Sequence, residues 1–255
     1  MLKKATNPWT SAGLSHPGRV RKTNEDAFLV QPQAGLWAVA DGMGGHAAGD
    51  VASRTVVDAL AQVGASGSLT TLDALVTATE DALLEANTEL LKLAMAQRQS
   101  LIGTTIAVLV SMGNHVVCLW AGDSRIYRYR PTDKAKRALQ PLTQDHAVVE
   151  ELMQVGLLNE AEVDLHPHAN RITRAIGAAD TLFVDMEIYA LQKGDQFLIC
   201  SDGLYKELSS DDIASIMAAQ DNDESCAQAL LDKTLERGAR DNTSVVIMSY
   251  GEKPA

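Results

Sequence analysis

The order of helix-like and strand-like patterns along this chain is the feature that most constrains its fold. Apolar residues spaced three to four apart predict amphipathic helices in two pairs, 50–63 with 72–97 and 210–219 with 224–237. Short apolar runs bounded by turn residues predict strands at 27–30, 36–40, 104–110, 115–121, 125–130, 182–189, 196–200 and 244–250. Because strands and helices come in blocks, we expect an α+β fold with mainly antiparallel sheets covered by separate helix layers.

Length and charge narrow the classes of protein further. The 255 residues can bury a large core, and we expect a single domain over 1–255. With 22 basic and 33 acidic residues, the net charge of −11 argues against nucleic acid or an anionic membrane as the main partner. No apolar run reaches the ~18–20 residues of a membrane span. The N-terminal stretch also lacks the apolar core of a signal peptide.

The cysteines indicate the redox conditions of the cellular compartment in which the protein is expected. Cys118, Cys200 and Cys226 have no zinc-site spacing, and three cysteines cannot form a disulfide framework. We therefore expect reduced thiols packed in strands and a helix, in a cytoplasmic protein.

The stretch AVADGMGGHAAGD, residues 38–50, allows two interpretations. Its segment GMGGHA matches the dinucleotide-binding pattern G-x-G-x-x-A, which needs a following strand and an acidic residue about 20 positions on. A second helix follows instead, and Asp58 lies inside the first helix, which argues against a nucleotide site. Alternatively, Asp41 at the end of an apolar strand holds a metal ion. Gly42 would then let a backbone carbonyl approach that ion.

Six acidic residues stand beside predicted strands. They are Glu25, Asp26, Asp41, Asp123, Asp202 and Asp241. A single Asp in such a place is more often a turn former or a helix cap. Six carboxylates brought together by adjacent strands would repel one another strongly unless cations neutralised them. Oxygen ligands without a Cys or His cluster favour Mg²⁺ or Mn²⁺, and several carboxylates suit a two-metal site for displacement at phosphorus.

A series of motifs resembles one known family. The motifs are GRVRKTNEDAF, VADGMGGHAAGDVAS, GTTIAVLV, WAGDSRIYRYR, LTQDHA, HPHANRITRAIG, FLICSDGL and ARDNTSVVIM. In this order they resemble the metal-dependent Ser/Thr protein phosphatases of the 2C type, in particular the compact bacterial branch, over about residues 11–250. The resemblance implies a four-layer α-β-β-α sandwich of two antiparallel sheets flanked by helix pairs. It also implies a mobile flap at about 145–170, a stretch whose acidic, His- and Pro-containing composition already sets it apart.

The resemblance further implies a set of metal ligands. Asp41 would bridge two core ions, and Gly42 would contribute a carbonyl oxygen. Asp202 and Asp241 would complete the two-metal core. Asp123 would share a third, weaker ion with Asp202.

Other roles implied by the resemblance concern the substrate and the attacking water. Glu25 would reach a metal through water, and Asp26 would orient metal-bound water. Arg21 would grip the substrate phosphate, which suits the fork of a guanidinium group. Some relatives place a histidine, a candidate general acid, where this chain has Met43. His46 or a metal-bound water remain as alternatives for that role.

The resemblance implies an enzyme, a protein-serine/threonine phosphatase. It would hydrolyse phosphoserine and phosphothreonine by in-line attack of a metal-bridging water, with Mn²⁺ or Mg²⁺. Phosphoproteins and a cognate Ser/Thr kinase in bacterial signalling are the expected partners, and a monomer is the expected state. The alternative is an inactive pseudophosphatase that binds phosphoproteins, but such a protein should have lost core carboxylates, and all of them are present here. A Cys-dependent phosphatase would need an arginine six positions after its cysteine, which no cysteine here has.

Overall fold

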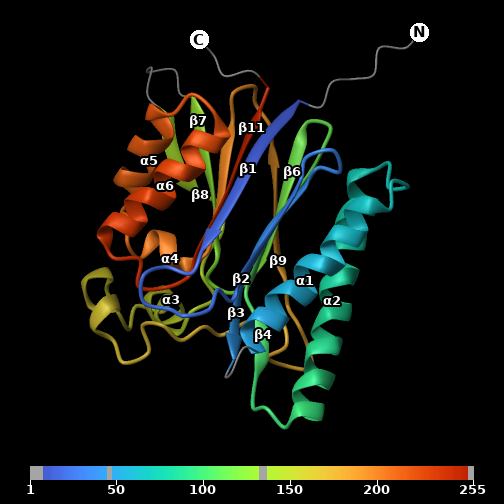
Figure 1. Ribbon diagram of the computed structural model, residues 1–255, viewed down its shortest axis with the longest axis vertical. Coiled ribbons are helices and arrows are strands. Elements are labelled where there is room, and N and C mark those ends of the chain that lie inside the picture. Colours follow the sequence, from blue (N-terminus) through green and yellow to red (C-terminus); the bar gives the residue numbers. More distant parts are fainter. Residues whose placement is uncertain (1–7, 45–47, 132–136, 252–255) are drawn as a thin grey trace.

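The computed structural model describes residues 8–44, 48–131 and 137–251 of the chain. Two β-sheets lie face to face at the centre, and a pair of helices covers the outer face of each (Figure 1). Every strand pairing within the described residues is antiparallel. The predicted α+β class and the four-layer α-β-β-α sandwich are therefore confirmed.

The first sheet has the strand order β1-β11-β10-β7-β8. Its strands are β1 (Trp9–His16), β11 (Thr243–Tyr250), β10 (Gln196–Cys200), β7 (Arg125–Pro131) and β8 (Arg137–Pro141). The second sheet has the order β2-β3-β5-β6-β9, with β4 paired to β3. Its strands are β2 (Asp26–Gln31), β3 (Leu36–Gly44), β4 (Ile102–Thr104), β5 (Ile106–Met112), β6 (His115–Ala121) and β9 (Asp185–Ala190).

The helices form the two outer layers. The second sheet is covered by α1 (Ala48–Ala65) and α2 (Leu72–Gln97), and the first by α5 (Ser210–Ala219) and α6 (Asp223–Arg237) (Figure 1). Three short helices lie outside these layers: α3 (Val148–Gln154), the 3₁₀ helix η1 (Glu160–Leu165) and α4 (Asp202–Tyr205). Both long helix pairs were expected from the apolar periodicity, and both are confirmed.

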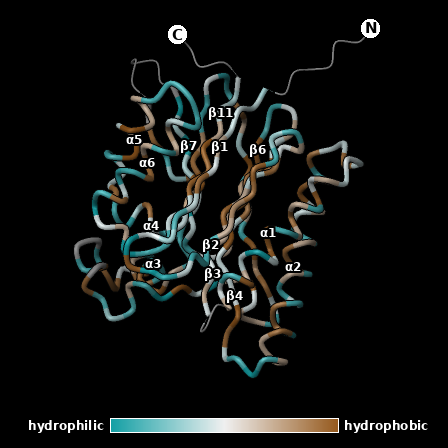
Figure 2. Tube along the Cα trace, in the orientation of Figure 1, coloured by the Kyte–Doolittle hydropathy of each residue, from teal (hydrophilic) through white to brown (hydrophobic). Residues whose placement is uncertain are grey.

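Alternation along β3 shows how the strands build two cores. Leu36, Ala38 and Ala40 pack with residues of α1 and α2. The intervening Trp37 and Val39 pack between the sheets. Because both faces of the strand are covered there, residues 36–40 at the start of β3 are all apolar (Figure 2). Burial of each large side chain here stabilises the fold by roughly 1.5–3 kcal/mol.

Three strands, β1, β4 and β8, were not predicted from the sequence. In β1 the segment WTSAGLSH mixes small and polar residues, and it becomes a strand because all eight of its residues pair with β11. The short β8 pairs with β7. The strand expected at 182–189 lies at β9, Asp185–Ala190, because its pairing with β6 begins at Asp185.

The polar stretch expected at about 145–170 does leave the sheets and return to them. Backbone hydrogen bonds close its base, from Val148 N to Arg171 O (2.9 Å) and from Thr173 N to His146 O (2.8 Å). We call the segment 148–171 the flap. It carries α3 and η1, and it lies near α4 at the lower end of the sheets (Figure 1).

The remaining expectations about the fold concern cysteines and membranes. Cys118, Cys200 and Cys226 form no disulfide and are buried, in β6, β10 and α6. Among the described residues, no helix is both long and apolar enough to cross a bilayer.

Candidate active site

The first part of the site lies at one end of the β2-β3 pair. Asp26 opens β2, and in the antiparallel register it stands directly opposite Asp41 in β3. Like charges in opposed positions of a sheet repel each other. Asp26 is buried, and only its Oδ2 has a partner among the described residues, the Ser201 hydroxyl at 2.7 Å. A buried carboxylate with one oxygen unpaired is costly unless a cation or a proton accompanies it.

The second part comes from the facing sheet. Asp202 follows β10 and opens α4, Asp241 precedes β11, and Asp123 lies in the turn between β6 and β7. Because β10 pairs with both β7 and β11, the ends of these strands bring the three carboxylates to one edge. We call Asp26, Asp41, Asp123, Asp202 and Asp241 the carboxylate cluster.

Titration of the cluster reflects burial and crowding. Burial raises the pKa of Asp41 well above its usual value, and the charges of the other four cluster members raise it further. Burial, with the charges of Asp202 and Asp241, raises the pKa of Asp26 to about 7, although the hydrogen bond from Ser201 opposes this. Burial and the charges of Asp202 and Asp145 raise the pKa of Asp123 to about 7. The cluster therefore holds more negative charge than its surroundings compensate.

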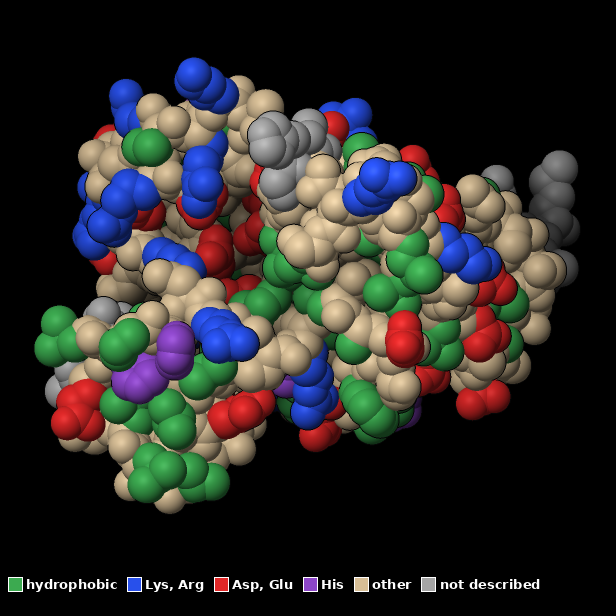
Figure 3. Space-filling view, turned by 90° about the horizontal axis from the view of Figure 1, so that it is seen from below, with side chains coloured by type: hydrophobic (Ala, Val, Ile, Leu, Met, Phe, Trp, Pro, Cys, Tyr) green, Lys and Arg blue, Asp and Glu red, His purple; other side chains and the backbone are tan. Residues whose placement is uncertain are grey.

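Two basic side chains border the cluster. The Nη2 atom of Arg21 lies 2.7 Å from Asp241 Oδ2, and Nζ of Lys206 lies 2.5 Å from Asp202 Oδ2. Seen from below the sheets, acidic side chains lie in a recess bordered by basic ones (Figure 3). The sequence analysis assigned Arg21 to the substrate phosphate, and in this structure its partner is Asp241. Lys206 was not identified from the sequence as part of the site.

Glu25 and Gly42 lie next to each other at the edge of the cluster. The Gly42 N–H donates to the Glu25 carbonyl at 3.1 Å. A Cβ on Gly42 would come 2.1 Å from the Gly49 carbonyl oxygen, so the start of α1 can approach β3 only because residue 42 is a glycine. Burial is the main cause that raises the pKa of Glu25, with the charges of Asp50 and Asp241 adding to it.

Hydroxyl and amide side chains hold the strand ends in place. Thr105 Oγ1 accepts from the Asp41 N–H (3.1 Å) and is 2.7 Å from the hydroxyl of Ser124, the residue after Asp123. Asn242, next to Asp241, accepts from the Glu25 N–H at 2.8 Å and donates to the Pro17 and Thr23 carbonyls. Sequence reasoning missed these supports, and their only signal was that they adjoin the acidic residues within the motifs.

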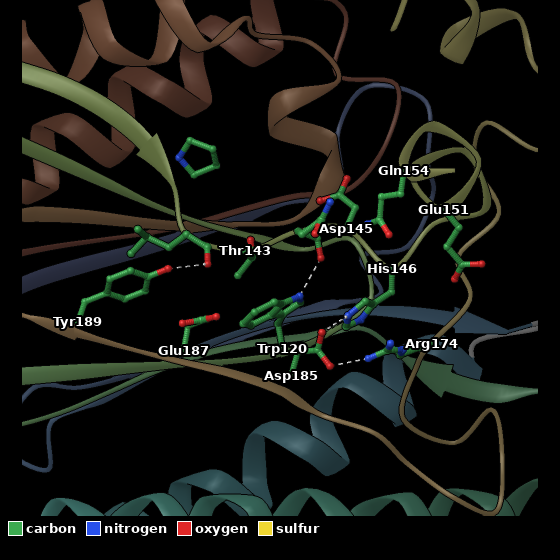
Figure 4. Close-up of a pocket in the computed structure, with 13 residues that line it drawn as sticks. Trp120, Thr143, Asp145, His146, Glu151, Gln154, Arg174, Asp185, Glu187 and Tyr189 are labelled. Carbon is green, nitrogen blue, oxygen red and sulfur yellow. Dashed lines mark hydrogen bonds and ion pairs between the residues drawn. The ribbon is translucent and has the colours of Figure 1, made fainter. Parts of the chain in front are cut away.

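A cavity of about 470 Å³ lies behind the turn that carries Asp123. There His146 Nδ1 accepts from the Gly122 N–H (3.1 Å), and His146 Nε2 is 3.1 Å from Asp185 Oδ2 (Figure 4). Asp185 also pairs with Arg174. Burial is the main cause that lowers the pKa of His146, which keeps Nδ1 available as an acceptor. This chain of contacts joins the Asp123 turn to the base of the flap.

The five cluster members expected at the site are thus brought together, with Glu25, Gly42 and Arg21 at their border. His46, one candidate for the general acid, lies outside the described residues. His166 and His168 lie in the flap, where their rings contact each other at 5.6 Å.

The cluster also bears on which ions this site could hold. The carboxylates of the cluster are buried and repel one another. Carboxylate oxygens are the hard, anionic ligands that Mg²⁺ and Mn²⁺ prefer. Within the described residues, no three Asp, Glu, His or Cys side chains already surround one point as metal ligands. Asp202 and Asp241 instead contact Lys206 and Arg21. The carboxylates of the cluster suit a divalent ion in their chemical type and in their burial. For such an ion to bind, Lys206 would have to move away from Asp202, and Arg21 from Asp241.

Comparison with known proteins agrees with this arrangement. Residues 13–236 match the family model described as Protein phosphatase 2C. The serine/threonine phosphatase stp of Listeria monocytogenes is 30% identical over 236 residues, which cover 91% of this chain and 92% of that protein.

Solved structures give the same result. PppA, described as a key regulatory component of the T6SS in Pseudomonas aeruginosa, is 37% identical with a TM-score of 0.85, over 95% of this chain and 97% of that one. The catalytic domain of the serine/threonine phosphatase PstP, in complex with two manganese ions, is 30% identical with a TM-score of 0.83, over 96% and 99%. On its sequence and its fold alike, this chain belongs to the protein phosphatase 2C family.

Proposed function

We propose that this chain is a metal-dependent protein-serine/threonine phosphatase that removes phosphate from phosphoserine and phosphothreonine. The observation that carries the proposal is the carboxylate cluster, whose negative charge the two bordering basic side chains only partly compensate. Membership of a family whose relatives are Ser/Thr phosphatases supports the reaction class.

Divalent ions would bind at the cluster. Asp41, Asp202, Asp241 and the Gly42 carbonyl would hold two Mn²⁺ or Mg²⁺ ions, and Glu25 would act through water. Asp123 and Asp202 are the residues available to a third ion. Bound ions of this kind supply an acidified water and polarise phosphoryl oxygens.

The chain's own groups supply binding and proton transfer. Arg21 lies at the border of the cluster with a side chain that is 57% exposed, so its guanidinium group can turn from Asp241 to a substrate phosphate. Asp26 Oδ1 has no partner among the described residues, so this oxygen is available to accept a hydrogen bond or a proton. Ser201 fixes the orientation of Asp26 through Oδ2.

The proposed substrates are phosphoproteins. A cognate Ser/Thr kinase and its targets, a cytoplasmic location and a monomeric state remain expectations from the sequence. We propose that residues of about 11–250 form a single catalytic domain, with the flap beside the cluster.

A metal-dependent assay tests this function. The purified chain should hydrolyse an aryl phosphate and a phosphothreonine peptide with Mn²⁺, and both activities should disappear in chelator and return with added ion. Activity that survives complete metal removal would contradict the two-metal site. Tight peptide binding without turnover, at any Mn²⁺ concentration, would instead support a pseudophosphatase.

A further inference from the structure

Lys206 has a position that the proposed reaction does not explain. It follows α4 directly and stands one helical turn after Asp202, where residues i and i+4 face each other. Its ammonium group lies 2.5 Å from Asp202 Oδ2, and its backbone N–H donates to the Asp202 carbonyl at 3.0 Å. The Lys206 side chain is 39% exposed and that of Asp202 only 14%, so the contact reaches inward from the surface.

Several carboxylates of the cluster contribute to the electrostatic field at the Lys206 ammonium group. Asp202, Asp123 and Asp41 all raise the pKa of Lys206, although its burial opposes them. In return, the Lys206 charge is among the causes that lower the pKa of Asp123. The geometry places the ammonium group directly on Asp202, one of the two carboxylates that a third ion would use.

The other basic groups nearby are engaged elsewhere. Arg21 pairs with Asp241, at the other border of the cluster. Arg125 stacks on the Tyr205 ring at 3.6 Å, but its guanidinium group makes a bidentate contact with Asp145. Tyr205 itself donates to the Asp123 carbonyl at 2.9 Å, which holds the Asp123 turn beside α4. Among the residues that the structure describes, Lys206 is thus the basic side chain that contacts the Asp123–Asp202 end directly, through Asp202.

We propose that the Lys206 ammonium group is a resident counter-ion of the carboxylate cluster, which stabilises the metal-free fold and competes with a divalent ion for the Asp123–Asp202 end. The inference rests on the proposed metal-dependent function. An ammonium group and a divalent ion that share one carboxylate repel each other, so an ion that binds at the Asp123–Asp202 end competes with Lys206 for Asp202.

The test compares Lys206→Met with two other variants. Methionine keeps the length and most of the apolar stem of lysine but has no charge. Lys206→Arg keeps the charge. Lys233→Met is the matched control, because Lys233 also forms a helical ion pair, with Glu236, and its side chain is 43% exposed. Mn²⁺ binding is measured by calorimetry and by the spin-resonance signal of free Mn²⁺, and the midpoint of thermal unfolding is measured in chelator.

The weakest Mn²⁺-binding step should strengthen about tenfold in Lys206→Met, which corresponds to about 1.4 kcal/mol. The metal-free midpoint of the same variant should fall by about 2–4 °C, as expected for a chain of this size that loses about one favourable contact. Lys206→Arg and Lys233→Met should bind Mn²⁺ as the unaltered chain does.

The outcomes separate this inference from the proposed function. If the unaltered chain binds no Mn²⁺, the metal-dependent function fails and the inference fails with it. If the unaltered chain binds Mn²⁺ and Lys206→Met binds it with unchanged affinities, the inference alone is wrong. The same holds if Lys233→Met strengthens binding as much as Lys206→Met does.

Discussion

Asp26 and Asp41 stand directly opposite each other in the antiparallel pair of β2 and β3, where most sheets place apolar or oppositely charged partners. Facing Asp26, Ser201 satisfies only one of its carboxylate oxygens. The free energy of the metal-free fold therefore includes an unfavourable contribution at this edge. Sites where local stability is sacrificed in this way are often where function resides.

Replacing Asp41 by Asn should uncouple stability from metal binding. Loss of one charge relieves the repulsion, so the metal-free midpoint of unfolding should rise by about 2–4 °C, while Mn²⁺ binding and phosphatase activity should be lost. Asp223→Asn is the control, because Asp223 is buried away from the cluster and accepts from Thr10 and Ser249. That variant should be less stable and still bind Mn²⁺. A less stable Asp41→Asn protein would contradict the repulsion.

The pH dependence of metal-free stability should follow Asp26 and Asp123. Their pKa values are raised to about 7 in the folded state, against about 3.9 for an unfolded Asp. Between these values the folded state binds more protons, so the free energy of unfolding should fall as pH rises from about 4 to about 7 and then level off. Urea unfolding in chelator measures this.

Asp26→Asn should flatten part of that slope, and saturating Mn²⁺ should flatten most of it. A metal-free stability that rises steadily from pH 4 to pH 7 would mean that these carboxylates titrate normally.

Arg21→Ala should weaken phosphate recognition. Hydrogen bonds from a charged donor contribute about 1.5–3 kcal/mol, so kcat/KM for an aryl phosphate should fall about tenfold to a hundredfold. Inhibition by inorganic phosphate should weaken in parallel. Arg19→Ala is the control, since the Arg19 side chain donates to the Leu235 carbonyl on the exposed surface. If phosphate inhibits Arg21→Ala as strongly as the unaltered chain, Arg21 does not bind the substrate phosphate, and its contact with Asp241 is structural.

Changes in the flap should depend on substrate size. Leu157 is 73% exposed and, like His168, lies in the flap and is not a member of the carboxylate cluster, so small substrates should be little affected. Substitution of either residue by Ser should lower kcat/KM for a phosphothreonine peptide more than for an aryl phosphate, because a large substrate must be oriented. Mn²⁺ affinity should not change. Leu84→Ser, at an exposed leucine of α2, is the control. Equal losses on both substrates would remove the flap from substrate choice.

The four layers could be predicted from the sequence because the helix pairs have strong apolar periodicity and the central strands are nearly continuous apolar runs. The sequence was insufficient for β1, whose residues Ser11, Ala12 and Gly13 favour no strand on their own and depend on pairing with β11. Tertiary pairing of this kind overrides local preference.

A similar limit applies to the site. The carboxylates beside strands predicted the cluster because several carboxylates gathered at one place most often bind metal ions. Thr105, Ser201, Asn242 and Lys206 carried no such signal, since these residue types are common on solvated surfaces. Their roles depend on distances between segments far apart in the chain, such as Ser201 to Asp26.

The closed base of the flap has an evolutionary consequence. Because two backbone hydrogen bonds between 146–148 and 171–173 fix where the segment leaves and rejoins the sheets, its interior can lengthen, shorten or change sequence without altering any strand register. The entropy of closing such a loop grows only slowly with its length, by about 0.6 kcal/mol for each doubling. The flap can therefore be replaced as a unit. Inserting the flap of another family member between these two pairs of residues offers a way to change which phosphoproteins are dephosphorylated, with the carboxylate cluster unaltered.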